Sequence, residues 1–342
     1  MQSIHPKNII VRMPNWVGDL VMATPILEDL RRAFPKAKIT AMCIESICQL
    51  LEKDDRIDEL FRFKKIPLFF ARRQERRNVL QKLHLGKYDT GILLTNTFSS
   101  AWLFWIARIP IRIGYAKHFR RVLLTHPMKY PERGHQIERY KKLLAPLGIG
   151  ICNTLPNIYL ADKEISDAKE LLYQRGYKEG RKLVGINPTS AYGPAKCWPK
   201  ENFRKAAVEL LSDPNLYLLF FGQSSDDLLI KQICEGLDPR AVDLAGVTTL
   251  RELAALIKNC DLLLTNDSGP MHIACAVQTP VVALFGSTDP EISGPYGERS
   301  TTIYKNLSCS PCGKRVCPIH FPCMKEISVK EVVQAIQQKL KS

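Results

Sequence analysis

The sequence predicts an α/β protein of two domains, each a parallel sheet with helices on both faces. Short apolar strands alternate with amphipathic helices along the chain, which is typical of such sheets. This alternation is interrupted at residues 148–156, which contain two glycines, an asparagine and a proline, and then starts again. The 342 residues also exceed the roughly 250–300 that one hydrophobic core usually serves. We therefore expect two Rossmann-like domains, residues 1–155 and 156–342, the alternative boundary lying after a helix at 163–175.

In the first half, an apolar strand at 9–12 precedes a polar loop at 14–19 and a single helix that runs to about residue 34. The other elements expected before the boundary are strands at 38–43 and 91–95 and helices at 46–51, 99–107 and 135–147. Residues 90–107 carry no charge and resemble a membrane span. The polar residues at their centre, Thr95 to Thr97 with Ser99 and Ser100, instead favour a strand, a loop and an apolar helix.

The second half repeats this pattern. Strands are expected at 183–187, 216–221, 262–265 and 281–285, and helices at 201–211, 226–235, 250–259 and 270–277. Thr249 and Glu252 form a capping box that predicts the start of the third of these helices.

Positive charge is concentrated in the first half of the chain. Residues 1–150 hold 27 Lys and Arg against 13 Asp and Glu, a net charge of +14, whereas residues 151–342 hold 22 against 21. Such asymmetry indicates that the first half meets a polyanion, namely nucleic acid, an anionic membrane surface or a phosphorylated substrate. The run at residues 64–82 contributes seven cations, although a solvated helix face also accounts for such runs.

The start of the sequence has no signal-peptide core, which predicts a cytosolic protein. In that compartment the 11 cysteines are expected as buried apolar residues or metal ligands before disulfides.

The most informative segment is Thr265-Asn-Asp-Ser-Gly-Pro-Met-His272, where a strand ends and a helix is expected to begin at Pro270. The free N–H groups of that helix end make an anion site at the carboxyl edge of the sheet, suited to a diphosphate. Asp267 would accept hydrogen bonds from sugar or ribose hydroxyls, or serve only as a helix cap. The sequence has neither G-x-G-x-x-G after a strand nor a P-loop, which disfavours an oxidoreductase or a P-loop enzyme.

Two further loops are expected at carboxyl edges of the sheets. Lys196, after the first strand of the second half, would reach a phosphate at the Gly269 helix and neutralise a diphosphate leaving group without a metal. Taken alone, Lys196 is an ordinary surface lysine. Asp19, after the first strand of the chain, would face a cleft between the domains, either as a general base or as a carboxylate that stabilises a helix N-terminus.

Three motifs together, at 15–19, 192–199 and 265–272, resemble in order and spacing those of glycosyltransferase family 9, and the resemblance covers most of the chain. It implies the GT-B fold, with an N-terminal acceptor domain and a C-terminal nucleotide-sugar domain. It also implies inverting, metal-independent transfer of heptose from ADP-L-glycero-β-D-manno-heptose to the inner-core heptose of Kdo–lipid A, in lipopolysaccharide core biosynthesis of Gram-negative bacteria.

The same resemblance implies roles for single residues. Asp19 matches the family's proposed base and Lys196 its phosphate-binding lysine. Four residues match the donor motif, and a fifth matches more loosely a position that binds the donor ribose: Asp267, Ser268, Gly269 and His272, and Asp226. Cys197 stands at a variable position where related enzymes carry a basic residue.

The implied acceptor agrees with the charge count, because Kdo–lipid A is an anionic lipid of the inner leaflet. A basic domain would be drawn to that surface as a peripheral protein, through Arg72, Arg73, Arg76 and Arg77 and through residues 117–121.

A cluster near the C-terminus has no place in this scheme. Cys309, Cys312, Cys317 and Cys323 lie within fifteen residues and resemble a structural zinc knuckle, although the wide second spacing also fits reduced thiols or a disulfide. No cofactor is expected for catalysis.

Two alternatives remain open. The motifs identify a diphosphate and not a sugar, so a family 9 transferase with another acceptor or nucleotide sugar fits them too. A non-catalytic protein that binds RNA or another polyanion fits the sequence pI of about 9.3, but the sequence has no RNA-binding motif or aromatic platform, and nucleic acid is not expected as a partner.

Overall fold

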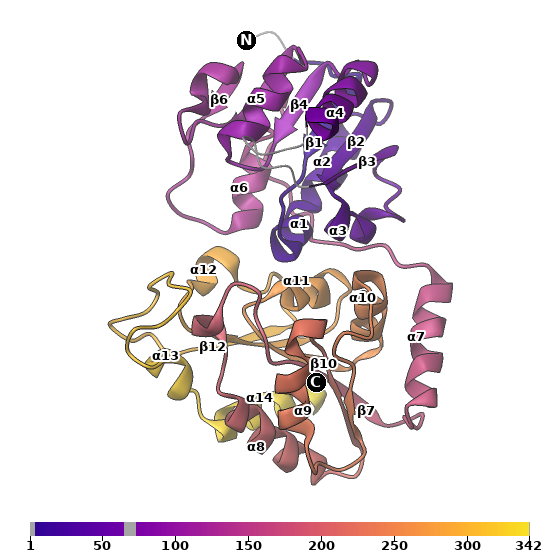
Figure 1. Ribbon diagram of the computed structural model, residues 1–342, viewed down its shortest axis with the longest axis vertical. Coiled ribbons are helices and arrows are strands. Elements are labelled where there is room, and N and C mark those ends of the chain that lie inside the picture. The colour runs from indigo at the N-terminus through magenta and orange to yellow at the C-terminus, as the bar shows by residue number, and fades with distance from the viewer. Residues whose placement is uncertain (1–3, 65–72, 342) are drawn as a thin grey trace. The chain divides into compact units, whose positions relative to one another are not determined.

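The computed structural model describes residues 4–64 and 73–341 and divides the chain into two compact units, Met1–Pro156 and Asn157–Ser342. The division falls one residue after the expected boundary. Figure 1 shows both units as parallel sheets flanked by helices, as the alternation predicted, and each unit is described by itself.

The sheet of unit 1 has six parallel strands in the order β3-β2-β1-β4-β5-β6. Their bounds are β1 (Asn8–Arg12), β2 (Lys38–Ile44), β3 (Glu59–Phe63), β4 (Thr90–Leu93), β5 (Ile111–Tyr115) and β6 (His126–Met128). The helices are α1 (Val17–Ala23), α2 (Pro25–Ala33), α3 (Glu45–Cys48), α4 (Arg73–Leu85), α5 (Phe98–Ile106) and α6 (Gln136–Lys142), with 3₁₀ turns η1 (Gln49–Leu51), η2 (Arg120–Leu123) and η3 (Ala145–Leu147).

The single helix expected up to residue 34 is wrong, because α1 ends before Thr24 and α2 starts at Pro25. Proline has no N–H to continue the hydrogen bonding of a preceding helix, but it fits the first turn of a new one. The uncharged stretch at 90–107 is β4, a polar loop and α5, as predicted. Among the described residues, no helix is both long and apolar enough to cross a bilayer.

The sheet of unit 2 repeats this topology, in the order β12-β11-β10-β7-β8-β9. Its strands are β7 (Lys182–Asn187), β8 (Leu216–Phe220), β9 (Ala241–Asp243), β10 (Leu262–Asn266), β11 (Val281–Phe285) and β12 (Ser300–Tyr304). Its helices are α7 (Asp162–Gln174), α8 (Lys200–Leu211), α9 (Asp227–Cys234), α10 (Leu250–Asn259), α11 (Gly269–Ala276), α12 (Pro290–Ser293), α13 (Pro322–Lys325) and α14 (Val329–Lys341), with 3₁₀ turns η4 (Pro194–Lys196) and η5 (Ser224–Asp226). Helix α8 packs against α9 and α14, and α10 packs against α7 and α11.

Each sheet contains one point where the chain reverses its direction of winding, between β1 and β4 in unit 1 and between β7 and β10 in unit 2. The two loops that leave such a pair of strands diverge and open a crevice at the carboxyl edge, where ligands of doubly wound sheets bind. Asp19 follows β1, and Asp267 follows β10. Both predicted motifs therefore lie at these topological switch points.

A buried cation holds the chain on each side of the boundary. Within unit 1, the amine of Lys141 is buried and donates to the carbonyl oxygens of Cys152 (2.5 Å) and Thr154 (2.7 Å). Within unit 2, Arg251 donates to the carbonyl oxygen of Tyr159 (2.8 Å) and pairs with Glu164. Residues 155–158 thus connect Thr154, which is held by Lys141 in unit 1, to Tyr159, which is held by Arg251 in unit 2.

Candidate active site

Asp267 is the centre of a polar network at the carboxyl edge of the second sheet. It directly follows β10 and is only 4% exposed, because side chains from two other loops, those after β7 and β11, contact it. One carboxylate oxygen, Oδ2, accepts hydrogen bonds from the Lys196 amine and from the Thr288 hydroxyl (2.6 Å). Its backbone carbonyl accepts from Ser190 (3.1 Å).

Lys196 and Asp267 form a buried ion pair, with side chains that are 11% and 5% exposed. In sequence they are 71 positions apart, and the parallel pairing of β7 with β10 brings their loops together. The sequence predicted both residues at this edge but not their contact. The amine that would bind a diphosphate is therefore held in place by the carboxylate that would bind a sugar.

Thr288, which no sequence motif indicated, follows β11 and donates to the same carboxylate oxygen. Removing this donor should leave Asp267 less well oriented, because a hydrogen bond to a charged group contributes about 1.5–3 kcal/mol. We expect Thr288→Val to lower kcat/KM for the donor substrate by about 10- to 100-fold, whereas Thr288→Ser keeps the hydroxyl and most of the activity. Steady-state kinetics with varied donor measure both, and equal values for the two variants would contradict this role.

The loop that carries Lys196 is fixed by contacts with residues 313–315. Gly193 has φ 146° and lies so close to this segment that a Cβ would meet the carbonyl oxygen of Arg315 at 2.6 Å, so only glycine fits. The Tyr192 hydroxyl donates to the carbonyl oxygen of Gly313 (2.5 Å). The Lys196 amine lies 4.5 Å and the Arg315 guanidinium 5.2 Å from the centre of the Tyr192 ring. Arg315 is thus a second cation that contacts the Tyr192 ring, one that the motifs did not reveal.

The other predicted donor residues surround this pair. Ser268 is the N-cap residue of α11, and its hydroxyl accepts from the Asn187 amide (3.1 Å) at the end of β7. The helix begins at Gly269, so Pro270 is its second residue and not its first. His272 is buried on the same helix.

Asp226 lies in the next loop, after β8. Its Oδ2 accepts from the backbone N–H of Gln223 (2.8 Å) and from the hydroxyl of Thr189 (3.0 Å). Through Thr189, the loop after β8 is joined to the loop after β7, so the candidate ribose-binding carboxylate belongs to the same polar edge as Lys196. Burial raises the pKa of Cys197, also in that edge, to about 11, so its thiol stays protonated near neutral pH.

In unit 1, Asp19 lies in the first turn of α1 and is half-buried. Its Oδ1 accepts a hydrogen bond from the hydroxyl of Tyr140 (3.1 Å) on α6, which the sequence did not predict. Burial holds the pKa of Tyr140 well above its usual value, and the negative charge of Asp19 is the second-largest cause. Tyr140 therefore stays protonated near neutral pH and can donate its hydrogen bond to Asp19.

A buried arginine shapes the loop that leads to Asp19. Arg12, the last residue of β1, donates to the side-chain oxygen of Asn15 (2.6 Å) and to the carbonyl oxygen of Met13, and its guanidinium lies 4.5 Å from the centre of the Phe63 ring. Burial lowers the pKa of Arg12 to about 9, which still leaves it charged at neutral pH.

Of the four arginines predicted to contact the acceptor or the membrane, Arg72 lies outside the described residues, and the side chain of Arg73 is likewise not described. Arg76 and Arg77 are exposed on α4, and the guanidinium of Arg76 lies 5.7 Å from the centre of the Trp102 ring on α5.

The cysteines differ from expectation in one respect, because Cys43 and Cys48 form a disulfide that joins the end of β2 to α3. The four thiols of the C-terminal cluster, Cys309, Cys312, Cys317 and Cys323, are free. Burial raises the pKa of Cys323, and the negative charges of the other three thiolates act in the same direction. Within residues 4–64 and 73–341, however, no three His, Cys, Asp or Glu side chains are arranged to hold a metal ion.

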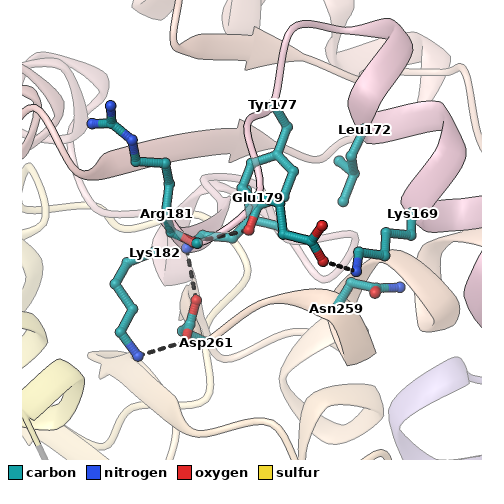
Figure 2. Close-up of a pocket in the computed structure, with 10 residues that line it drawn as sticks. Lys169, Leu172, Tyr177, Glu179, Arg181, Lys182, Asn259 and Asp261 are labelled. Carbon is teal, nitrogen blue, oxygen red and sulfur yellow. Dashed lines mark hydrogen bonds and ion pairs between the residues drawn. The ribbon is translucent and has the colours of Figure 1, made fainter.

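A cavity of about 390 Å³ lies at the opposite edge of the second sheet, where β7 and β10 begin (Figure 2). Four of its charged side chains form two ion pairs, Lys169 with Glu179 (2.6 Å) and Lys182 with Asp261 (2.8 Å). The fifth, Arg181, donates to the carbonyl oxygen of Pro214 and to the side-chain oxygen of Asn215 (3.1 Å). The hydrogen bond from Lys169 to Glu179 lowers the pKa of the Glu179 carboxyl group and raises the pKa of the Lys169 amine. The cavity lies away from the carboxyl edge at which ligands of doubly wound sheets bind, so it is not a second candidate for the active site.

The chain has two Rossmann-like units, with polar side chains at the carboxyl edge of each sheet, which is the architecture expected of a glycosyltransferase of the GT-B type. Comparison with known proteins agrees. The family model described as glycosyltransferase family 9 (heptosyltransferase) matches residues 76–321. The chain belongs to this family.

The chain is 31% identical to lipooligosaccharide heptosyltransferase 2 of Haemophilus ducreyi, over 86% of this chain and 88% of that protein. The structure of ADP-heptose lps heptosyltransferase II from E. coli superposes with a TM-score of 0.82 and 26% identity, over 98% of each chain. A family 9 glycosyltransferase from Veillonella parvula superposes with a TM-score of 0.86 and 28% identity, over 98% of this chain and 97% of that one.

Proposed function

We propose that this enzyme transfers heptose from ADP-L-glycero-β-D-manno-heptose to the inner-core heptose of Kdo–lipid A during lipopolysaccharide core biosynthesis, with inversion and without a metal. The observation that carries the proposal is the buried Lys196–Asp267 pair at the N-terminus of α11, at a topological switch point. The names of the similar proteins, which mention ADP-heptose and lipopolysaccharide, support the choice of donor and acceptor.

In this proposal unit 2 binds the donor. The Lys196 amine and the free N–H groups at the start of α11 neutralise the diphosphate, because both present positive charge at one edge of the sheet. Asp267 accepts hydrogen bonds from the heptose hydroxyls, and Asp226 from those of the ribose. Ser268, Gly269 and His272 shape the helix end that receives the phosphates.

The transfer itself is a single displacement. Asp19 accepts the proton of the acceptor hydroxyl while that oxygen forms a bond to the anomeric carbon of the heptose. The bond from the anomeric carbon to the β-phosphate oxygen breaks, and its electron pair leaves with ADP. Attack on the face opposite the leaving group inverts the configuration. The negative charge that develops on ADP is stabilised by Lys196.

Two other functions remain as alternatives, and both are tested directly. The purified protein is incubated with ADP-heptose and with Kdo–lipid A that carries one heptose, and mass spectrometry detects the addition of a second heptose. No product with these substrates, but product with another nucleotide sugar or acceptor, would favour a different specificity within the family. Tight binding of RNA in a gel shift at physiological salt, unaffected by Asp267→Asn, would favour a polyanion-binding protein.

We further propose that unit 1 associates peripherally with the anionic face of the cytoplasmic membrane. Replacing Arg72, Arg73, Arg76 and Arg77 by glutamine should raise the KM for the lipid acceptor and weaken binding to anionic vesicles, since each basic residue near such a surface contributes about 1 kcal/mol. High salt should have the same effect on the wild type. The affinity for ADP, measured by calorimetry, should not change. Unchanged vesicle binding and acceptor KM would mean that these arginines have no role in membrane association.

A structural zinc on Cys309, Cys312, Cys317 and Cys323 stays a prediction. Thiolates are suitable zinc ligands, but three of these side chains are half-buried or exposed and are not arranged around a common point within the described chain. Metal analysis of the purified protein tests this prediction.

A further inference from the structure

Unit 1 exposes large apolar side chains in two neighbouring elements, α5 and η2. Phe119 is 96% exposed and Val122 82% exposed around η2, and Phe98 and Trp105 on α5 are 41% and 50% exposed. The elements pack against each other. With the half-buried Trp102, Phe98 and Trp105 fall at positions i, i+4 and i+7 and share one face of α5, whereas the fourth aromatic residue of the helix, Phe104, is buried in the core. This surface, Phe98, Trp102, Trp105, Phe119 and Val122, is called the aromatic edge below.

A fully buried arginine fixes this arrangement. Arg120, next to Phe119, donates to the carbonyl oxygens of Tyr115 (2.7 Å) and Thr95 and to the side-chain oxygen of Asn96 (3.3 Å). It therefore joins the turn after β5 to the loop between β4 and α5, which ends directly before Phe98. Both loops leave the carboxyl edge of the sheet, the edge at which Asp19 also lies.

The backbone turns Phe119 outward at a cost in conformational energy. His118 and Phe119 are consecutive and both have left-handed backbone angles, with φ 52° and 60°. Such conformations disfavour residues with a side chain by about 1 kcal/mol or more each. The hydrogen bonds that the buried Arg120 donates to the carbonyl oxygens of Tyr115 and Thr95 hold the chain next to Phe119 in place, so Phe119 stays exposed.

Positive charge surrounds the aromatic edge. Arg121 lies between Phe119 and Val122 and is exposed, as is Arg108 just after α5. On the neighbouring α4, Arg76 lies over the ring of Trp102 and Arg77 is exposed. Exposed aromatic and aliphatic side chains interspersed with arginines match the interface of an anionic bilayer, where aromatic rings enter the headgroup region and cations meet lipid phosphates.

We infer that the aromatic edge inserts into the interface of an anionic membrane and that Phe119 and Val122 are its deepest residues. The inference rests on the proposed function, because it identifies the surface by which unit 1 would reach a lipid-embedded acceptor. It differs from the role of the arginines on α4, since apolar insertion resists salt whereas attraction between charges does not.

Sedimentation with vesicles of phosphatidylglycerol and phosphatidylcholine tests the inference. The double variant Phe119→Ser/Val122→Ser should lower the vesicle partition coefficient about ten-fold or more, at low and at high salt, because burial of either side chain stabilises the bound state by at least that factor. A matched control is Val208→Ser/Leu228→Ser, which removes two apolar side chains of unit 2 that are 56% and 70% exposed. This control should bind vesicles as the wild type does.

A second measurement tests the inference even if the serine double variant does not fold. Phe119→Trp keeps an apolar side chain, and lipids brominated on their acyl chains should quench its additional fluorescence. Absence of quenching, or wild-type vesicle binding by the serine double variant, overturns the inference. So does a dimer of the wild type that the serine variant abolishes without a change in vesicle binding, since a second copy would then cover this surface.

The two proposals fail in different ways. Transfer of heptose to a deacylated, water-soluble acceptor should be the same in the wild type and in Phe119→Ser/Val122→Ser. If the wild type transfers no heptose to any acceptor but still inserts through Phe119, the proposed function is wrong and the insertion surface stands. If the wild type transfers heptose and the serine variant binds vesicles as the wild type does, the proposed function stands and the insertion surface is wrong.

Discussion

Replacement of Asp19 by Asn is expected to lower turnover by ~10²–10⁴-fold, the usual contribution of a general base. Asparagine keeps the shape of the side chain and accepts the hydrogen bond from Tyr140, but it cannot take a proton from the acceptor hydroxyl. The affinity for ADP should stay near that of the wild type, because the donor residues belong to unit 2. Turnover within about three-fold of the wild type would show that Asp19 only stabilises the start of α1.

Tyr140→Phe is the companion variant, because it removes one hydrogen bond to Asp19 (3.1 Å) and leaves the carboxylate. Its loss of turnover should be clearly smaller than that of Asp19→Asn, on the order of ten-fold, as expected for one hydrogen bond to a charged group. Adding Tyr140→Phe to Asp19→Asn should have little further effect, since a positioning residue acts only through the base. Additive losses would assign Tyr140 a separate function.

Replacement of Lys196 by Ala is expected to lower kcat/KM for the donor by ~10²–10³-fold, the effect of losing one group that stabilises transition-state charge. Both kcat and KM should change, because the amine meets the diphosphate before the bond breaks and the charge grows afterwards. In the wild type, turnover should persist in EDTA. Loss of turnover in EDTA that Mg²⁺ restores would contradict a metal-independent mechanism.

The ion pair complicates this variant, because Lys196→Ala leaves Asp267 buried without its cation. Breaking a buried pair by removing one partner costs about 3–5 kcal/mol, so a lower melting temperature is also expected. The double variant Lys196→Ala/Asp267→Asn removes the unpaired charge. It should regain much of the thermal stability but none of the activity. Activity that returns together with stability would mean that Lys196 is needed only for folding.

The central strands of both sheets were predictable because they are buried and their residues are therefore mostly apolar. Strands β1, β4, β7, β8, β10 and β11 are buried, mostly uninterrupted apolar runs, and each was expected within one or two residues. The strands that the sequence did not reveal are β5 and the four at the sheet edges, β3, β6, β9 and β12. Edge strands are short or partly exposed, so their composition resembles that of loops.

The candidate site likewise contains residues that the sequence predicted and residues that it did not. Asp19, Lys196 and Asp267 stand in local motifs, each where a strand meets a loop, so their positions at the carboxyl edges follow from the chain order of strands and helices. Thr288, Tyr140 and Arg315 stand in no such motif. Thr288 contacts Asp267 from a loop 21 residues away, and Tyr140 contacts Asp19 across 121 residues. No local pattern encodes these contacts.

The sequence by itself therefore determined the fold class, the two-unit organisation and the residue types at each switch point, because these depend on periodicity and on spacing within one strand, loop and helix. Only the tertiary structure decided which of these residues touch. It paired Lys196 with Asp267 and buried Arg120 next to an exposed Phe119, and it formed two ion pairs at the 390 Å³ cavity. Such contacts depend on the order and register of strands that are distant in the chain, and burial and hydrogen bonding select them only when the sheets have formed.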